Sequence, residues 1–375
     1  LMSTTTALVL RDINGPFRLE KITLNAIRSD EALVEIHATG ICHTDISCAN
    51  GTLPATAPAV FGHEGAGVIK EVGSDVTDLS PGDKVVLSFA HCNSCEHCES
   101  GHPAYCTSFV QRNFGGTRLD GSTTLSLGEH QDQKPLYSSF FGQSSFAKLA
   151  IAHRSSLVKV APDTDLALVA STGCGLQTGA GAIFNTLDVQ SGKTVAIFGV
   201  GSVGMSAIMA AKLRNAKSII AVDLQQSRLD LAIALGATDA ILGSDSDIIE
   251  KIQRISSKNG VDCAVDCSGV PAVIETMIKC LGTRGKAVTL GAPSPGKTIG
   301  VDVFAHLING REYVGCCEGD ALPHESIPYL IEQQAQGNYP IEKLVKYYNA
   351  EDFQQAFDDA STGKALKAVL IWKHY

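Results

Sequence analysis

One glycine-rich turn constrains the fold of this chain more than any other feature of its sequence. It follows a short run of apolar residues, Val195–Phe198, and leads into a helical pattern. From about residue 172 onward, similar apolar runs alternate with helical segments. Strands that are apolar throughout are typical of a parallel sheet covered by helices on both faces. The sequence therefore predicts a doubly wound parallel sheet, the Rossmann fold, over residues 175–315.

The turn itself has the spacing G-x-G-x-x-G. A lone match is weak evidence, but a preceding strand and a following helix are the context that the pattern needs. Gly199 permits the tight turn, Gly201 lets the backbone approach a pyrophosphate, and Gly204 allows helix and strand to pack closely. Ser202 and Val203 begin the helix, whose free N–H groups favour phosphate. We therefore expect a dinucleotide site, and a glycine-rich turn without a cofactor is the less favoured alternative.

The end of the next predicted strand bears on which dinucleotide is bound. Asp223 lies about 20 residues beyond the turn, where an acidic residue accepts hydrogen bonds from ribose hydroxyls. Its carboxylate would repel a 2′-phosphate, so NAD(H) is favoured over NADP(H). Arg228 lies nearby and is a second candidate for cofactor contact that weakens this preference.

A compact group of cysteines is the sharpest metal signal in the chain. The run is Cys92-x2-Cys95-x2-Cys98-x7-Cys106. Four thiolates suit tetrahedral Zn²⁺ and leave no open position, so we expect a structural zinc. Four reduced cysteines in a loop are the alternative. We expect the three neighbouring histidines to be solvated: His91, His97 and His102.

Three further candidate metal ligands lie far apart in the sequence. Cys42 lies in GICHTD, residues 40–45, His63 in GHE, residues 62–64, and Cys174 far downstream. Together they form a Cys₂His set with one open position, the pattern of a catalytic zinc. Such a zinc can lower the pKa of an alcohol, and alkoxide character favours hydride donation to nicotinamide. Alone, Cys174 could be a small core residue and His63 a structural one, but the two other motifs favour the joint interpretation.

Composition limits the remaining possibilities. A chain of 375 residues is long enough for two domains, and residues 65–88 predict an antiparallel, barrel-like region before the Rossmann domain. The net charge of −9 argues against nucleic-acid or membrane-surface partners held by general electrostatics. We interpret Leu1-Met2 as a vector remnant, and we expect no signal peptide and no membrane span. Twelve cysteines without a secretory signal favour the cytoplasm.

Taken together, these motifs resemble the zinc-dependent, medium-chain alcohol dehydrogenase family over essentially the whole chain. The resemblance is carried by residues 40–45, 62–67 and 82–85, the two cysteine sets and the glycine-rich turn. It implies a GroES-like, β-rich catalytic domain of residues 1–174 and 316–375, with the NAD-binding Rossmann domain inserted. It also implies two zinc ions per chain, an active site between the domains, a small alcohol or aldehyde substrate, and a homodimer or homotetramer.

The resemblance also implies roles for individual residues. Thr44 matches the hydroxyl that bonds the substrate alkoxide and starts a proton relay. Asp45 matches the carboxylate that orients the histidine ligand, and Glu64 an acidic neighbour that can approach the metal. His43 and Lys367 match contacts to the cofactor phosphates. Asp45 could instead be a helix N-cap, and Lys367 a solvated charge at a strand edge.

One position departs from the usual pattern. Many members of the family have a histidine three residues after the relay threonine, where it passes the proton to solvent. Here the residue is Ser47, which cannot act as a base near neutral pH. The proton would then leave through a ribose hydroxyl and water, or directly to bulk solvent.

The C-terminal part suggests a substrate class. Residues 315–321, 327–328 and 343–345 resemble the aryl-alcohol (benzyl-alcohol) dehydrogenase group. We expect reversible oxidation of a benzylic or related primary alcohol to the aldehyde. The candidate pocket residues could equally be core residues: Leu53, Phe89, and Phe140 or Phe141. The alternatives are a polyol or formaldehyde-type zinc dehydrogenase and a non-catalytic zinc- and nucleotide-binding protein. A zinc ribbon that binds nucleic acid is disfavoured by the acidic charge.

Overall fold

The computed structural model describes residues 4–128 and 134–373, and the chain divides into two units. The first contains the chain up to Cys174, together with Leu322–Glu332 and the segment from Ile341 onward. The second contains Gly175–Ala321 and Gln333–Pro340. The first unit is rich in antiparallel strands and the second contains a parallel sheet, so the predicted fold class is confirmed.

The main sheet of the first unit has seven strands in the order β16-β17-β3-β4-β5-β9, with β8 also paired to β3. Its neighbours are antiparallel except for β16 and β17. In the register of this sheet, Gly40 lies opposite both Glu64 and Val369. Three segments that are distant in sequence therefore meet at one end of β3. The strands are β3 (Glu31–Gly40), β4 (Glu64–Val72), β5 (Lys84–Leu87), β8 (Leu149–His153), β9 (Leu157–Lys159), β16 (Val345–Asn349) and β17 (Lys367–Ile371).

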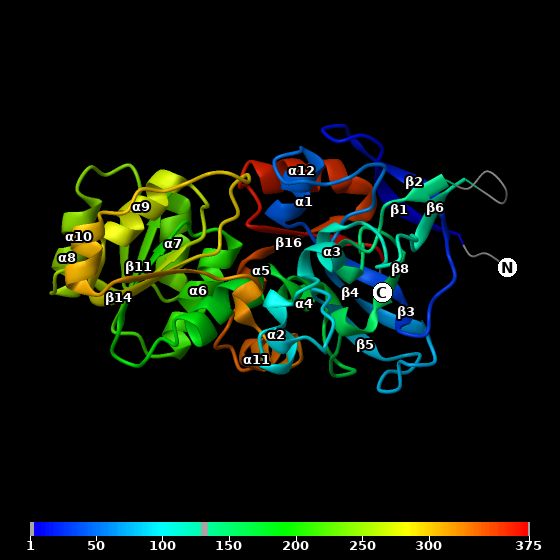
Figure 1. The fold of residues 1–375 in the computed structure, drawn as a ribbon, viewed down its shortest axis with the longest axis horizontal. Helices are drawn as coiled ribbons and strands as arrows, with labels where there is room; N and C mark the ends of the chain where they lie inside the picture. Colours follow the sequence, from blue (N-terminus) through cyan, green and yellow to red (C-terminus); the bar gives the residue numbers. More distant parts are fainter. Residues whose placement is uncertain (1–3, 129–133, 374–375) are drawn as a thin grey trace. The chain divides into compact units, whose positions relative to one another are not determined.

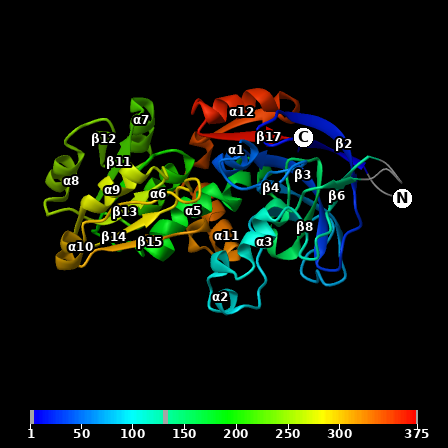
Figure 2. The same ribbon diagram turned by 45° about the horizontal axis from the view of Figure 1, so that its top comes forward.

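A smaller antiparallel sheet and short helices complete the first unit. The strands of the smaller sheet are β1 (Thr4–Leu10), β2 (Phe17–Leu24), β6 (Leu125–Leu127) and β7 (Lys134–Leu136). The helices are α1 (His43–Ala49), α2 (Glu96–Glu99), α3 (Phe109–Phe114), α4 (Leu166–Val169), α11 (Pro323–Ala335, its last turn in the second unit) and α12 (Phe353–Ser361). In Figure 2, α12 lies alongside β17, the strand that joins the C-terminal segment to β3.

The second unit is a six-stranded parallel sheet in the order β12-β11-β10-β13-β14-β15. This is the doubly wound order, in which the chain starts at the centre and reverses direction beside the first strand. The strands are β10 (Thr194–Phe198), β11 (Ser218–Asp223), β12 (Asp239–Leu242), β13 (Val261–Asp266), β14 (Leu281–Thr289) and β15 (Glu312–Gly315). The helices are α5 (Gly175–Gly181), α6 (Ser202–Leu213), α7 (Gln226–Leu235), α8 (Ile248–Ser256), α9 (Pro271–Lys279) and α10 (Val303–Asn309). Figure 1 shows the strands between these helices.

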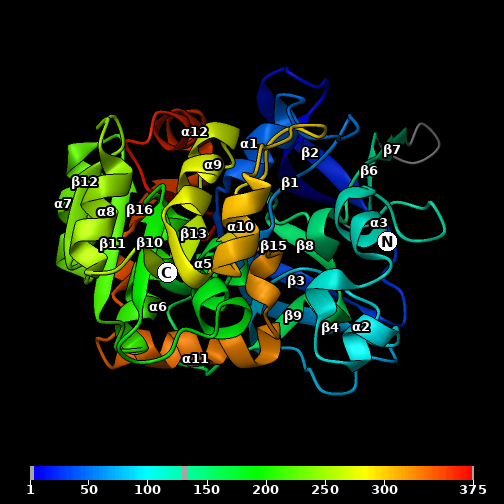
Figure 3. The same ribbon diagram turned by 60° about the vertical axis from the view of Figure 1, so that its left-hand side comes forward.

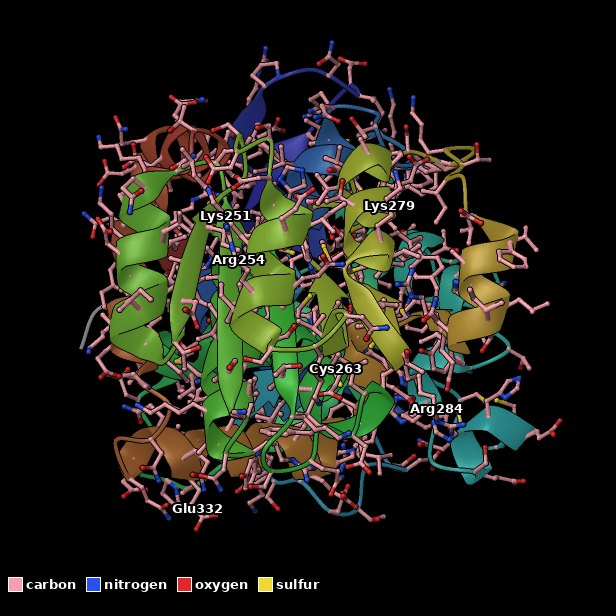
Figure 4. The ribbon with its side chains drawn as sticks, turned by 90° about the vertical axis from the view of Figure 1, so that its left-hand side faces the viewer. Lys251, Arg254, Cys263, Lys279, Arg284 and Glu332 are labelled. Atoms are coloured by element: carbon pink, nitrogen blue, oxygen red, sulfur yellow. The ribbon has the colours of Figure 1, made fainter. Side chains whose placement is uncertain are left out.

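Helices α8 and α9 cover one face of this sheet because their apolar residues recur at helical spacing. Ile248, Ile252 and Ile255 of α8 pack on the apolar cluster formed by β10, β11 and β13. Figure 3 shows both helices in front of the strands. In Figure 4 the labelled charged residues Lys251 and Arg254 belong to α8, whereas the buried Cys263 belongs to β13 beneath it.

The boundary at the C-terminal side differs from the sequence-based expectation. Residues 316–321 and 333–340, which we assign to the catalytic domain on sequence grounds, belong to the second unit. The amide of Asn185 donates to the carbonyl groups of Gly319 and Asp320, at 3.0 Å each. The hydroxyl of Thr186 donates to Cys316 Sγ at 3.1 Å, and the buried Tyr339 bonds Ser206 of α6. These contacts have no sequence signature, so composition could not place the boundary.

The predicted lack of a membrane span can be compared with the helices. Among the described residues, no single helix is long and apolar enough to cross a membrane. One sharply bent pair, residues 166–173 and 175–186, reaches the required length and apolar character only when the two are taken together.

Candidate active site and metal centres

Cys42 lies where β3 passes into α1. It is the N-cap of that helix, and Asp45 is the third helical residue. The backbone N–H of Cys42 donates to Asp45 Oδ2 at 3.0 Å, which satisfies one of the free N–H groups at the helix start. The N-cap is therefore Cys42 and not Asp45, contrary to the alternative interpretation. Asp45 caps the helix from its third position, and its other oxygen is free for a second task.

That second task is to hold His63. Asp45 Oδ1 accepts hydrogen bonds from His63 Nδ1 and from the backbone N–H of Gly62, at 3.0 Å each. With the proton on Nδ1, the lone pair of His63 Nε2 is available, and this buried atom has no hydrogen-bond partner among the described residues. Gly62 has φ of +90°, and a Cβ there would lie 2.4 Å from the backbone nitrogen of Phe146. The local chain path thus requires glycine before the histidine.

The structure brings together the three residues that the sequence singles out as an open metal site. One ligand atom each from Cys42, His63 and Cys174 lies within 4.8 Å of the others. A hydrogen bond from Cys174 is the largest of the influences that hold the pKa of Cys42 well below its ordinary value. Two thiols and an unpartnered imidazole nitrogen are the donors that Zn²⁺ prefers, and three protein ligands leave a fourth position open. The set therefore fits a catalytic zinc.

An aromatic loop borders this site. Phe141 lies in a 3₁₀ turn, η3 (Phe140–Gly142), and its ring stacks on the His63 ring with centroids 4.4 Å apart. The Phe140 ring meets His63 edge-on at 5.4 Å. Ser139, Phe141 and Ser144 all have positive φ, a conformation that costs about 1–2 kcal/mol per non-glycine residue. Such strain is often found at functional sites, and here it brings two rings to the candidate histidine ligand.

The other candidate pocket residues lie differently. Phe89 is fully buried, and its ring packs against His91 and Phe109, with centroids 5.7 and 5.8 Å apart. These are core contacts, as the alternative interpretation allowed. Leu53 is half-buried and its N–H donates to the carbonyl of Ser47.

The predicted relay starts on α1. Thr44 is half-buried, and its Oγ1 lies 3.7 Å from Cys42 Sγ. Ser47 is buried one turn later. His43, the proposed cofactor contact, is exposed at the start of the helix.

The structure changes the interpretation of Lys367. Its ammonium lies 2.8 and 2.9 Å from the two carboxylate oxygens of Glu64 and 3.3 Å from the carbonyl of Ile41. Lys367 is only 2% exposed, so it is not a solvated strand-edge charge, and any contact with a cofactor phosphate would be made by an ammonium already paired with Glu64. Burial alone would lower the pKa of Lys367, but the Glu64 carboxylate raises it well above its usual range. No local sequence pattern indicates this pair, because β17 and β4 are joined in the sheet only through β3.

The carboxylate of Glu64 is engaged in the same ion pair. Both of its oxygens are occupied by Lys367, and burial raises the pKa of its carboxyl while Lys367 opposes that shift. A Cβ on Gly40 would lie 2.0 Å from Glu64 Oε2, so the glycine at the end of β3 provides the space for this carboxylate. Movement of Glu64 toward a metal would require breaking its ion pair.

The four-cysteine set forms a second cluster. One sulfur atom each from Cys92, Cys95, Cys98 and Cys106 lies within 4.8 Å of the others. The Sγ atoms of Cys92 and Cys98 are 3.9 Å apart, and thiolates bound tetrahedrally to zinc are about 3.8 Å apart. Hydrogen bonding from the backbone of Thr107 and of Cys98 lowers the pKa of Cys95 to about 5. The cluster therefore fits a closed structural zinc.

One histidine beside this cluster was expected in solvent and is not. His91 is buried against the Phe89 ring, and burial lowers its pKa to about 4. An apolar neighbour two residues earlier, on the same face of an extended chain, could have indicated this.

The glycine-rich turn joins β10 to α6 as predicted. Gly199 has φ of +84°, and a Cβ on Gly204 would lie 2.1 Å from the carbonyl oxygen of Gly199. A Cβ on Gly201 would meet nothing within 4 Å, so the backbone there faces open space that a pyrophosphate can approach. Ser202 and Val203 form the first turn of α6. The turn thus fits a dinucleotide.

Asp223 has a structural task besides the predicted one. Its Oδ2 accepts the N–H of Val200 within the turn at 2.8 Å, and its Oδ1 accepts the N–H of Gln225 at 2.9 Å. Each carboxylate oxygen can still accept a second bond. Arg228 Nη1 lies 3.8 Å from Asp223 Oδ2, and the buried Arg228 Nε has no hydrogen-bond partner among the described residues. Both side chains therefore retain capacity for a ligand.

Comparisons with known proteins agree with this architecture. The alcohol dehydrogenase GroES-like domain matches residues 28–162, and the zinc-binding dehydrogenase family matches residues 202–335. Geraniol dehydrogenase of Castellaniella defragrans is 36% identical over 98% of this chain and 97% of its own length. S-(hydroxymethyl)glutathione dehydrogenase of Saccharomyces cerevisiae is 32% identical over 97% and 95%, respectively.

Solved structures extend the comparison. An alcohol dehydrogenase zinc-binding domain protein from Burkholderia ambifaria has a TM-score of 0.96 and 44% identity, with 100% of both chains covered. Benzyl alcohol dehydrogenase from Acinetobacter calcoaceticus has a TM-score of 0.94 and 38% identity, covering 98% of this chain and 99% of its own. With two fitting zinc clusters and full-length relatives of this kind, the chain belongs to the zinc-dependent, medium-chain alcohol dehydrogenase family.

Proposed function

We propose that this alcohol dehydrogenase interconverts a benzylic or related aromatic primary alcohol and its aldehyde, with NAD as the cofactor. The observation that carries the proposal is the pair of phenylalanine rings beside the candidate metal ligand His63. Flat apolar rings favour stacked or edge-on contact with an aromatic substrate. The 38% identity to a benzyl alcohol dehydrogenase supports the same substrate class.

Each residue of the site has a proposed part in this reaction. Cys42, His63 and Cys174 hold the catalytic zinc, which when bound supplies Lewis-acid polarisation of the substrate oxygen. Asp45 keeps the His63 proton on Nδ1 and so leaves Nε2 as the ligand atom. Thr44 Oγ1 lies beside Cys42, where it would accept a hydrogen bond from the substrate hydroxyl and, on taking up that proton, release its own to a ribose hydroxyl or to water. Ser47 provides no base, so the pH profile of kcat should lack a relay imidazole ionisation.

A panel of alcohols followed by NADH absorbance tests the substrate class. We expect kcat/KM for benzyl alcohol to exceed that for ethanol and sorbitol by at least about a hundredfold, since ring burial contributes about 3 kcal/mol. Little preference among these alcohols would overturn the aromatic assignment. Geraniol and S-(hydroxymethyl)glutathione belong in the panel because relatives at 36% and 32% identity carry those names. A preference for either would identify the corresponding alternative.

Asp223 supports NAD as the cofactor. Its carboxylate is oriented by two backbone N–H groups, as suits an acceptor for ribose hydroxyls. We expect Asp223→Ala to raise KM for NAD about tenfold or more and to narrow the discrimination against NADP. Because the same carboxylate also braces Val200, KM for NADP should not fall below that of the wild type. An unchanged cofactor preference would show that the carboxylate argument is wrong.

We also propose that the chain forms a homo-oligomer through its second unit. Four apolar residues of α10 are between 59% and 75% exposed: Val303, Phe304, Leu307 and Ile308. The helix precedes β15, which ends the described sheet and so presents an unpaired edge. A second copy would cover both features. Light scattering of Leu307→Glu should show dissociation, and an unchanged mass would exclude this surface.

A reducing compartment, such as the cytoplasm, is the proposed location. All twelve cysteines are free in the described structure. Six of them belong to the two clusters, where thiolates rather than disulfides are needed. Fractionation that found the protein in an oxidising compartment would contradict this proposal.

A further inference from the structure

The two buried ligands His63 and Cys174 come from separate segments, and a hydrogen-bonded chain links their backbones. It begins at Gln143, which is 1% exposed and follows the aromatic turn η3. Gln143 Nε2 donates to the carbonyl of His63 at 3.1 Å and to the carbonyl of Ser88 at 2.9 Å. Gln143 Oε1 accepts the N–H of Gly65 at 3.2 Å. The single amide of Gln143 thus links the backbone on either side of Glu64, at His63 and Gly65, to Ser88, which follows β5.

The chain continues from Ser88 to the third ligand. Ser88 Oγ donates to the carbonyl of Gly173, the residue before Cys174, at 2.7 Å. Gly173 also packs closely on β5, because a Cβ there would lie 2.0 Å from the carbonyl oxygen of Leu87. The backbone positions of His63 and Cys174 are therefore tied to each other through two side chains.

This link complements the one made by Asp45. Asp45 fixes Cys42 to Gly62 and to the imidazole of His63. Gln143 and Ser88 instead reach the segment that carries Cys174. We propose that Gln143 is a positioning residue that, through Ser88, sets the separation of His63 and Cys174 and so the geometry and retention of the catalytic metal. The inference depends on the proposed ligand set.

Gln143 lies in the same loop as the aromatic rings, so a purely structural role for it must be distinguished. The loop has other supports: Ser144 Oγ donates to the carbonyl of Val60 at 2.7 Å and accepts the N–H of Phe140 at 3.0 Å. Loss of the Gln143 amide should therefore leave the loop folded while loosening the tie to His63.

The test replaces Gln143 by methionine, which has similar length but no amide. Asn113→Leu is the matched control, because Asn113 is an equally buried amide whose three backbone hydrogen bonds go to Ala90 and Phe109 and to no ligand of the open site. Each variant is loaded with zinc or Co²⁺, and thermal unfolding, metal release to a chelating dye and the cobalt d–d absorption are recorded. The d–d bands report ligand geometry independently of turnover.

For Gln143→Met we expect about tenfold faster release of one of the two metals and a shifted d–d band, the size of effect typical of outer partners of ligands. Asn113→Leu should lower thermal stability without changing the d–d band of the open site. Ser88→Ala should change release in the same direction, and the double variant should be no worse than the more affected single one, because both cut one link.

The outcomes are separable. If Gln143→Met releases metal at the wild-type rate with an unchanged cobalt spectrum, Gln143 serves only loop stability and the inference is overturned. If the wild type itself binds metal only at the four-cysteine cluster, the proposed ligand set of Cys42, His63 and Cys174 is wrong, whatever the behaviour of the Gln143 variant.

Discussion

The two cysteine-containing clusters of this enzyme are built in opposite ways. The four thiols of residues 92–106 come from one short segment, and three of them are half-exposed. The open cluster takes Cys42, His63 and Cys174 from three segments, and its histidine is wholly buried. The closed cluster needs little beyond its own loop, whereas the open cluster needs the sheet, the helix cap and buried side-chain hydrogen bonds. Because the open cluster must leave one metal position for substrate, it has no fourth protein ligand. Surrounding hydrogen bonds position its three ligands instead.

The largest expected effect comes from removing a ligand of the open cluster. Cys174→Ser should lower kcat/KM by about a thousandfold or more, because Lewis-acid polarisation contributes several kcal/mol. Zinc content should fall from two per chain to one. Cys48→Ser, at a buried cysteine of α1 that belongs to neither cluster, is the control and should keep both metals. Elemental analysis with steady-state kinetics checks this; full activity in Cys174→Ser would refute the ligand set.

The second-largest effect is expected on folding stability, from breaking the ion pair between Lys367 and Glu64 beside the open cluster. Lys367→Met leaves Glu64 buried without its partner, which typically lowers the free energy of unfolding by about 3–5 kcal/mol. Adding Glu64→Gln should recover part of the loss. Lys159, whose partner Asp83 lies at the surface, supplies the comparison: Lys159→Met should cost about 1 kcal/mol or less.

Urea unfolding of these variants measures the difference. Equal losses for Lys367→Met and Lys159→Met would mean that burial of the first pair has no energetic consequence.

The closed cluster should affect stability and not chemistry. Cys98→Ser should remove one zinc and lower the melting temperature by about 5–10 °C, the equivalent of about 2–3 kcal/mol. The kcat per active site should change less than about twofold at a temperature where the variant remains folded. Calorimetry and metal analysis test this, and an unchanged metal content would exclude Cys98 as a ligand.

The smallest effect concerns the helix cap. Asp45→Asn keeps the size of the side chain but removes the charge that orients His63, so metal affinity at the open cluster should fall about 10–100-fold. The closed cluster should keep its zinc, because none of its ligands contacts Asp45. Competition with a chelating dye measures both affinities, and equal weakening at the two clusters would point to general destabilisation.

The closed and the open cluster also differ in how much of each could be predicted from the sequence. The spacing of Cys92 to Cys106 was sufficient to predict their cluster, since ligands so near in sequence need only a loop to meet. The turn at Gly199–Gly204 was equally predictable, because its strand, turn and helix are contiguous in the sequence. Cys42, His63 and Cys174 are far apart in the sequence, so only their residue types and the presence of the other two motifs predict that they form one set, and the structure brings them together.

Other features had no local signal. The buried ion pair of Lys367 has no sign in its own segment, because the antiparallel pairing of β17 with β3 places it against Glu64. Residues 316–321 belong to the second unit, where Asn185 and Thr186 bond them, and these contacts have no local sequence signal. Gln143 follows the two phenylalanines of a loop, and nothing in that stretch of sequence shows that its amide reaches three backbone groups.

The sequence alone thus determined the parallel sheet, the dinucleotide turn and both sets of metal ligands as residue types, because periodicity and contiguous motifs are local properties. Only the tertiary structure decided how the open cluster is held. It pairs Asp45 with His63 and Glu64 with Lys367. It also links His63 to Ser88 through Gln143 and places the rings of Phe140 and Phe141 on His63. The Glu64–Lys367 pair, for example, joins segments that meet only when β3 lies between β4 and β17. Register within a sheet is a collective outcome of packing, and no single segment encodes it.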